Sequence, residues 1–288
     1  MREKFNREAC EMCEIFLWVM LHINREFAHL VDGTLTPPHG WAHPAGMDRW
    51  RSQLTAWNHA INSRVFSDIG INIPPMFGLI CLFVDGTFKH VCRPGQSQQN
   101  AGFFSNLQQS LYTRYKSGHG LIFQAVTSPS GMIVDFYGPG PGRQNDRWLV
   151  RESDLDARLL SLFGGIGYTC YGDSIYTITQ AIVRRIRGAV LLPWQSQINQ
   201  SLNRERTSVE HVFAGVVQQF KFLNFRHNHK LFDSACGAGI PFRCGALLFN
   251  LQTCMNGGNQ VTVRFGLSPP EVRDYMAGGV EPQNIEIV

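Results

Sequence analysis

The run Phe77-Gly-Leu-Ile-Cys-Leu-Phe-Val84 is continuous, apolar and of strand length, and Asp85-Gly86 follows it directly. Runs of this kind are typical of strands that are buried on both faces, as in the middle of an α/β sheet. The apolar character stops at Asp85, so a carboxylate stands where the run leaves the core. The stretch therefore predicts a central strand with an acidic side chain at its end.

Outward from this strand, the sequence carries further strand and helix signals. Strands are predicted at residues 121–127, 132–137, 168–171 and 189–192, and helices at 1–30, 48–66, 151–163, 175–187 in part, 196–223 and 245–255. Residues 33–46 are rich in proline and glycine and residues 95–106 are polar, so both predict loops.

The order of these elements indicates the fold class. Strands cluster first and long helices follow, which differs from a steady βαβα alternation and suits a mixed sheet. We expect an α/β domain over residues 73–288, with a mixed sheet flanked by helices. An N-terminal helical region is expected over residues 1–72.

The composition is that of an ordinary globular chain, because 44% of the 288 residues are hydrophobic and 17% are charged. The formal net charge of +4 permits a polyanionic partner without requiring one. The apolar residues 15–23 are too few to span a bilayer, which takes about 20 residues. We therefore expect no membrane partner.

Three acidic residues stand where a sheet and a helix can bring them together. Asp85 and Asp173 each follow a predicted strand, and Glu210 lies in the longest predicted helix. Strand ends project side chains into one crevice, and a helix across that edge can add a third. Carboxylate oxygens suit Mg²⁺ or Mn²⁺, and two such ions about 3.5–4 Å apart clamp the attacking and leaving oxygens of a phosphodiester.

Each of these residues also has an ordinary structural interpretation. Asp85-Gly86 between apolar runs is typical of a hairpin turn. Asp173 can cap a helix that follows it. Thr207-x-x-Glu210 has the form of a capping box, and Arg206 and Glu210 are placed for an i,i+4 ion pair. Spacing alone leaves both interpretations open.

Four pieces of sequence occur in order between residues 75 and 255. They are Phe83-Val-Asp-Gly-Thr87 with Arg93-Pro94-Gly95, the central segment 123–146, Gly172-Asp173-Ser174 with Tyr176, and Asn203-x-x-Arg206-x-x-Val209-Glu210-x-x-Phe213. Together they resemble the DDE superfamily endonucleases of the Harbinger and IS5-like transposase group. The resemblance implies a ribonuclease H-like fold, two divalent ions (Mg²⁺ or Mn²⁺) held by Asp85, Asp173 and Glu210, and cleavage and transfer of DNA strands.

The sequence departs from the family pattern in two places. The family's His-Asp pair is Asn145-Asp146 here, which leaves Asp146 as an accessory candidate, either a fourth carboxylate or a helix cap. Arg206 is a second accessory candidate, which would orient Glu210 or contact phosphate. The helix-turn-helix of many relatives is not evident upstream, so a separate DNA-binding protein is an expected partner.

Two basic clusters are candidates for contact with DNA. The first holds Arg184, Arg185 and Arg187, and the second holds Lys221, Arg226 and Lys230. Basic side chains neutralise phosphates and release counterions, although a solvated helix face has the same composition.

Our main hypothesis is a transposase-type DNA endonuclease that acts on transposon ends and target DNA in the nucleus, with a homo-oligomer as a further expectation. The alternative is a domesticated, non-catalytic DNA-binding or protein-interaction module with the same fold. An unrelated α/β hydrolytic enzyme ranks last, because the sequence holds no Gly-x-Ser-x-Gly elbow, Walker loop or HExxH motif.

Overall fold

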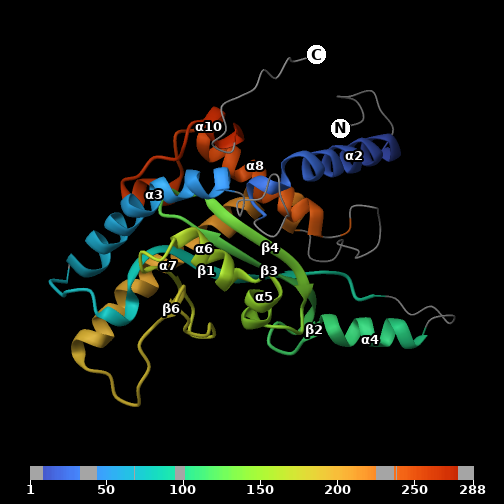
Figure 1. Cartoon of the computed structure of the whole chain (residues 1–288). Helices are drawn as coiled ribbons and strands as arrows, with labels where there is room; N and C mark the ends of the chain where they lie inside the picture. The colour runs from blue at the N-terminus through green and yellow to red at the C-terminus, as the bar shows by residue number, and fades with distance from the viewer. Residues whose placement is uncertain are drawn as a thin grey trace.

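A mixed β-sheet lies at the centre of the computed structural model, which describes residues 9–32, 44–67, 69–94, 101–224, 237 and 239–277 (Figure 1). Its strands are β1 (Leu79–His90), β2 (Tyr112–Thr113), β3 (Gly118–Thr127), β4 (Ile133–Pro141), β5 (Tyr168–Gly172) and β6 (Ile182–Arg184). The predicted α/β class with a mixed sheet is thus confirmed.

The strand order places β1 in the middle of the sheet. β3 pairs antiparallel with β1 and β4 pairs antiparallel with β3, whereas β5 runs parallel to β1 and β6 parallel to β5. The short strand β2 adds to the far end of β3. The apolar run thus forms a central strand, as predicted, because both of its edges are hydrogen-bonded.

One irregularity interrupts the pairing of β1 with β5. Ile80 lies opposite Thr169 and Leu82 lies opposite Cys170, so Cys81 is one extra residue on β1. Such a β-bulge bends the strand locally and resets which side chains face each side of the sheet. From Leu82 onward the register is regular again and ends with Val84 opposite Gly172.

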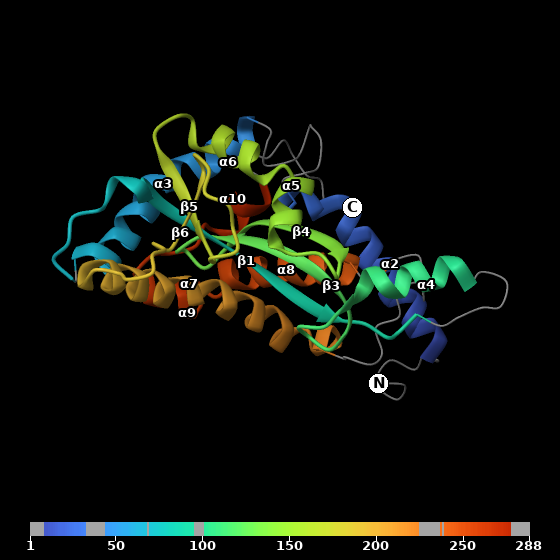
Figure 2. The ribbon, with the colours of Figure 1, turned by 90° about the horizontal axis from the view of Figure 1, so that it is seen from below.

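Helices cover both faces of the sheet. They are α2 (Ala9–Phe27), α3 (Pro44–Asn62), α4 (Ala101–Leu111), α5 (Asp146–Glu152), α6 (Leu155–Phe163), α7 (Pro193–Gln219), α8 (Gly239–Met255), α9 (Gln260–Phe265) and α10 (Val272–Ala277). Figure 2 shows α7 and α8 on one side of the sheet and α5 and α6 on the other. None of the helices in the described part of the chain is long and apolar enough to cross a membrane.

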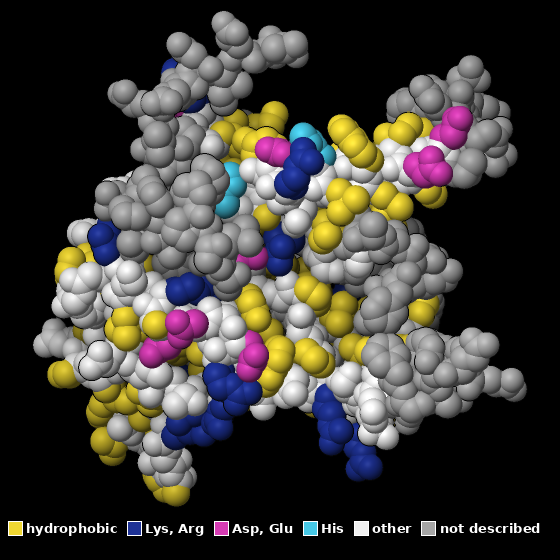
Figure 3. Space-filling model, turned by 45° about the vertical axis from the view of Figure 1, so that its right-hand side comes forward, with side chains coloured by type: hydrophobic (Ala, Val, Ile, Leu, Met, Phe, Trp, Pro, Cys, Tyr) yellow, Lys and Arg dark blue, Asp and Glu magenta, His cyan; other side chains and the backbone are white. Residues whose placement is uncertain are grey.

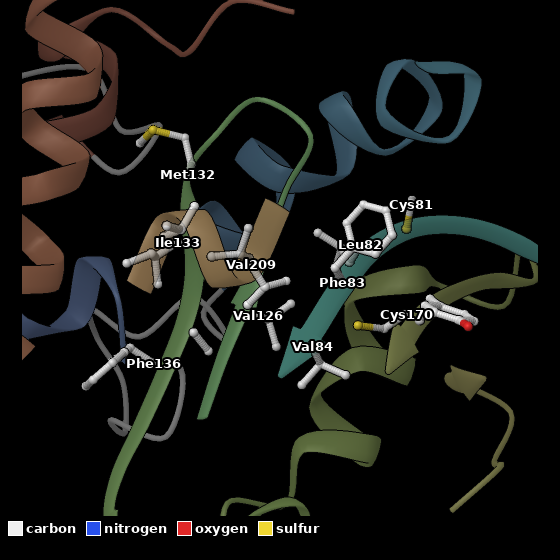
Figure 4. Packing of buried hydrophobic residues seen from close by; sticks show 14 of the residues in the cluster. Cys81, Leu82, Phe83, Val84, Val126, Met132, Ile133, Phe136, Cys170 and Val209 are labelled. Carbon is white, nitrogen blue, oxygen red and sulfur yellow. The ribbon is translucent and has the colours of Figure 1, made fainter. Parts of the chain in front are cut away.

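The hydrophobic core joins the sheet to the helices. Figure 4 shows Val209 of α7 among apolar side chains of β1 and β3, including Phe83 and Val126. Trp50 and Trp57 of α3 are buried in the same core cluster. Full burial of an apolar side chain contributes about 1.5–3 kcal/mol, so this packing fixes α7 and α3 against the sheet.

Two predictions between β5 and α7 are wrong. Residues 175–187 are not helical, and residues 189–192 are not a strand. The fifth strand of the main sheet is β6, whose residues Ile182 and Val183 are buried against β5. A strand of three residues is stabilised by its neighbour rather than by its own sequence, so the local pattern gives little sign of it.

Several helix boundaries also differ from expectation. α3 begins at Pro44, and α4 begins at Ala101 inside the segment predicted as a loop, whose residues 95–100 lie outside the described part. The helix expected at 151–163 is two helices, α5 and α6. They are separated at Asp154, which has a left-handed backbone with φ of 51°.

Candidate active site

Asp85 lies within β1 and not in a turn. The strand continues to His90, and Asp85 lies opposite Ala125 of β3, so the hairpin interpretation is wrong. Its side chain is 14% exposed and accepts a hydrogen bond of 3.0 Å from the amide of Gly86. A carboxylate is thus held at the edge of the core, where burying a charge is costly unless it is paired and hydrogen-bonded.

Asp173 leaves the neighbouring strand at the same level. Val84 lies opposite Gly172 in the parallel pairing of β1 and β5, so Asp85 and Asp173 are the next residues on adjacent strands. Adjacent strands lie about 4.8 Å apart, which brings the two backbones close together. No helix begins at Asp173, since the chain turns and the amide of Tyr176 donates to the carbonyl of Asp173 at 3.2 Å. The capping interpretation of Asp173 is therefore wrong.

Asp146 reaches the same place from α5. Its carboxylate lies so close to Gly86 that a Cβ there would stand 2.0 Å from Oδ1. Gly86 is therefore required by close approach, and a side chain at that position would displace Asp146. The cap of α5 is Asn145, whose side chain accepts from the amide of Trp148 at 3.2 Å. Asn145 thus carries the capping role and leaves the Asp146 carboxylate at the site.

Glu210 approaches from α7 on the other side of the sheet. It lies well inside the 27-residue helix, so Thr207-x-x-Glu210 is not a capping box. The predicted i,i+4 ion pair is present, with Arg206 Nη2 3.2 Å from Glu210 Oε1. Arg206 Nη1 also donates to Asp85 Oδ2. One guanidinium therefore bridges the strand carboxylate and the helix carboxylate, while Glu210 remains 56% exposed.

The electrostatics of this cluster favour added positive charge. Burial raises the pKa of Asp85 from its ordinary 3.8 to about 6, aided by Glu210 and Asp173 and opposed by Arg206. Burial likewise raises the pKa of Asp146 to about 6, with further contributions from Asp85 and Asp173. A cation would relieve both effects, because it favours the ionised form of each carboxylate.

Two buried polar residues lie near the carboxylates, because Gln124 pairs with Gly86 and the charges of Asp146 and Asp85 act on Tyr176. Gln124 of β3 donates from Nε2 to the hydroxyl of Tyr176 at 3.2 Å, and both side chains are buried. Burial raises the pKa of Tyr176 well above 10, followed by the charges of Asp146 and Asp85. Sequence reasoning assigned no role to Gln124, although a glutamine inside an apolar strand was a signal of a polar site.

The first basic cluster serves the site through the loop after Asp173. Arg184 donates to the carbonyls of Ser174 and Tyr176 at 2.9 and 3.0 Å, and Arg187 donates to Ser174. Arg147, which sequence reasoning missed, donates to Ile175 at 2.5 Å. These arginines therefore brace the loop and give it a positive border.

The remaining DNA-contact candidates are scattered. Arg185 and Lys221 are exposed, with Lys221 just beyond the end of α7. Arg226 and Lys230 lie outside the described residues. The second basic cluster therefore stays a prediction.

The donor chemistry of the cluster fits a divalent ion. Asp85, Asp146 and Asp173 offer the carboxylate oxygens that Mg²⁺ and Mn²⁺ prefer, and two of them have a raised pKa. Among the described residues, however, no three Asp, Glu, His or Cys side chains are gathered closely enough to form a ready-made metal group. The carboxylates influence each other's pKa over distances longer than a metal–ligand bond, so both observations hold together. In this structure Arg206 supplies the positive charge next to Asp85 and Glu210.

Comparison with known proteins agrees with the order of these residues. Residues 84–242, more than half of the chain, match the family model described as DDE superfamily endonuclease. The match begins just before Asp85 and includes Asp146, Asp173 and Glu210. No curated protein and no solved structure matched the chain. The chain therefore belongs to the DDE superfamily endonucleases.

Proposed function

We propose that this protein is a metal-dependent DNA endonuclease of the transposase kind, which hydrolyses and transfers DNA phosphodiester bonds. The observation that carries the proposal is the placement of Asp85 and Asp173 directly after paired residues of adjacent parallel strands, with Arg206 joining Asp85 to Glu210 of α7. Membership of the endonuclease family supports the same reaction class.

In this proposal Asp85, Asp173 and Glu210 hold two ions of Mg²⁺ or Mn²⁺. When bound, the ions activate water or a DNA 3′-hydroxyl and stabilise the leaving oxygen. Asp146 adds a fourth carboxylate, which raises the negative charge of the site. Arg206, which pairs with Asp85 and Glu210, would be available to contact a DNA phosphate once metal ions neutralise these carboxylates. Gln124 and Tyr176 hold each other in place near the carboxylates through their buried hydrogen bond.

The finer assignments belong to the same proposal. The sheet, with three antiparallel strands followed by two parallel ones, supports a ribonuclease H-like fold. The sequence pieces around the carboxylates support the Harbinger and IS5-like group. We also propose transposon ends and target DNA as substrates, a separate DNA-binding protein and a second copy of this chain as partners, and action in the nucleus.

The test is cleavage of supercoiled plasmid DNA by the full chain with Mg²⁺, Mn²⁺ or EDTA. Asp85→Asn, Asp173→Asn and Glu210→Gln each keep the shape of the side chain and remove its charge. We expect nicking by the natural protein with either metal, and loss of nicking to background in each variant, because the metal ligands are removed.

Two matched controls separate chemistry from folding. Asp154→Asn keeps a residue type that tolerates the left-handed backbone, and Glu152→Gln removes an exposed charge of α5. Both are expected to cleave normally. Undiminished cleavage by Asp85→Asn, with circular dichroism like that of the natural protein, would contradict the assignment.

A second candidate function is favoured by one observation. Arg206 already bridges Asp85 and Glu210, so the chain itself supplies the positive charge that a metal would bring. A domesticated, non-catalytic DNA-binding or protein-interaction module would retain such a neutralised site. It predicts DNA binding that weakens with salt but ignores Mg²⁺, and no nicking by the natural protein.

A further inference from the structure

A positively charged recess lies beside the carboxylate cluster. Its volume is about 650 Å³, and its described lining includes Arg93, Arg114, Arg143 and His119. The other lining side chains are glutamine, tyrosine and threonine, so the described lining holds no carboxylate. In Figure 3, Lys and Arg side chains form two separate groups at the lower edge of the face shown.

The recess has an ordered framework. Arg93 donates to Gln108 of α4 at 3.2 Å, and Gln108 donates to the carbonyl of Pro94 at 2.6 Å. The amide of Arg143 donates to the carbonyl of Ser110 at 2.9 Å. Arg114 and Arg143 are exposed, and neither side chain is paired with another residue of the described part. Two guanidinium groups therefore stand available on a fixed frame.

The surrounding sequence makes the charge one-sided. No Asp or Glu occurs between Asp85 and Asp135, while Lys89, Arg93, Arg114 and Lys116 all do. Asp135, which closes that interval, is itself bound by Arg158 at 2.7 and 3.1 Å. A recess lined by one sign of charge concentrates ligands of the opposite sign.

The recess is also close to the carboxylate cluster. Arg143 precedes Asp146 by three residues, so their Cα atoms are at most about 11 Å apart. Along β1, His90 follows Asp85 by five residues, a length of about 17 Å, and pairs with Gly120, the neighbour of His119 in the recess.

Tyr112 and His119 line the same recess, and Tyr115 follows its lining residue Arg114 in the chain. The rings of Tyr112 and His119 lie 5.2 Å apart, and Tyr115 is 87% exposed with the Lys116 amine 4.9 Å from its ring centre. Exposed aromatic rings near cations suit nucleic acid, because bases stack on the ring while phosphates meet the charge.

We propose that the recess of Arg93, Arg114 and Arg143 binds the phosphate backbone of DNA on one side of the carboxylate cluster. This inference rests on DNA as the substrate of the proposed function and extends it to a surface that sequence reasoning did not select. Arg114 and Arg143 contact phosphates directly, and Tyr115 stacks on a base where the strand is unpaired.

The experiment measures binding of a fluorescein-labelled DNA duplex to the full chain by fluorescence anisotropy. EDTA is present, so cleavage plays no part, and salt is varied between about 50 and 200 mM. For the double variant Arg114→Ala/Arg143→Ala we expect affinity lower by on the order of tenfold. The slope of log affinity against log salt is negative and should become shallower by about 2, one unit for each phosphate that the variant no longer neutralises.

Two further variants serve as controls. Arg25→Ala/Arg151→Ala removes the same charge from two exposed arginines, 74% and 73% exposed, that pair with neighbouring glutamates. It is expected to keep the affinity within about twofold, since neither arginine lines the recess. Arg114→Lys/Arg143→Lys keeps both charges and is expected to keep the natural salt slope.

Several outcomes would overturn the inference. They are natural affinity in the alanine variant, equal weakening in the Arg25 and Arg151 control, a reduced slope in the lysine variant, or no salt-dependent DNA binding by the natural protein. Cleavage in Mg²⁺ is measured separately. Absence of nicking would remove the proposed nuclease function but leave binding in EDTA intact, so the two failures are distinguishable.

Discussion

Two acidic residues of α7 have opposite surroundings, although five positions separate them. Glu205 is fully buried and is bound by Arg64, Arg204 and Arg264 at 2.7 to 3.2 Å. Glu210 is largely exposed and shares the single guanidinium of Arg206 with Asp85. Three arginines therefore surround the single carboxylate of Glu205, whereas the two carboxylates of Glu210 and Asp85 share one arginine.

The difference appears in the direction of the pKa. Burial would raise the pKa of Glu205, but hydrogen bonds and charges from Arg264 and Arg64 outweigh it and lower the pKa. Around Arg206, burial prevails and the pKa of Asp85 rises to about 6. A fully compensated buried acid is typical of a structural role, whereas under-compensated acids in a cluster are typical of a functional one.

The largest expected change in stability comes from removing the charge of Glu205, the acid that three arginines surround. Glu205→Gln leaves three arginines without their shared carboxylate, so we expect it to lower the free energy of unfolding by about 3–5 kcal/mol. Urea denaturation at pH 7 measures this. A loss below about 1 kcal/mol would show that Glu205 contributes little to folding.

The next substitution, at Asp146, is expected to raise the free energy of unfolding instead of lowering it. The folded pKa of Asp146 is raised, so its contribution to stability is greatest below the ordinary value of 3.8 and is lost as pH rises through about 6. Asp146→Asn removes the charge that burial opposes. We expect it to stabilise the protein in EDTA by about 1–3 kcal/mol at pH 8, and by nearly nothing at pH 4. Unfolding curves at both pH values test this, and destabilisation at pH 8 would contradict it.

A smaller effect sharpens the comparison at Arg206. Arg206→Gln removes the partner that lowers the pKa of Asp85, so the cost is felt where Asp85 is ionised. We expect a loss of about 1 kcal/mol at pH 8 and a smaller loss at pH 5. The measurement is urea denaturation in EDTA at the two pH values. An equal loss at both would mean that Arg206 acts through packing.

The smallest expected change in stability comes from an exposed ion pair and serves as a reference for the other three substitutions. Glu152→Gln breaks the exposed pair with Arg151, whose guanidinium is 73% exposed. Surface pairs of this kind contribute little, so we expect a change within about 0.5 kcal/mol at every pH. Thermal unfolding followed by circular dichroism provides the check. A larger change would mean that surface charge affects this fold generally and would weaken the contrast between Glu205 and Asp85.

The sequence predicted the parts of the site that local patterns encode. Asp85 follows an apolar run, Asp173 follows a short strand, and Arg206 and Glu210 have helical spacing. Each of these positions is visible within about ten neighbours. The central strand and the mixed sheet followed from the same patterns.

The sequence did not reveal features that depend on distant partners. Gly86 looked like a turn because the close approach of Asp146 lies sixty residues away in the chain. Glu205 looked like any polar helix residue, since Arg64 and Arg264 reach it from other elements. The segment that contains β6 was predicted to be partly helical, because its strand conformation depends on pairing with β5 and not on its own sequence. Interactions between residues far apart in the sequence leave little local trace, and these account for most of the errors.

The bulge at Cys81 has a consequence for how this chain can change over time. Side chains alternate across a strand, so one residue added or removed between Cys81 and Asp85 would turn every later position to the opposite face. After a deletion, Gly86 would stand where Asp85 stands, and the aspartate would point away from Asp173. Substitutions in this segment alter packing by degrees, whereas a change of length there inverts the site at once. We therefore expect substitutions between Cys81 and Asp85 to be tolerated more readily than insertions or deletions of one residue.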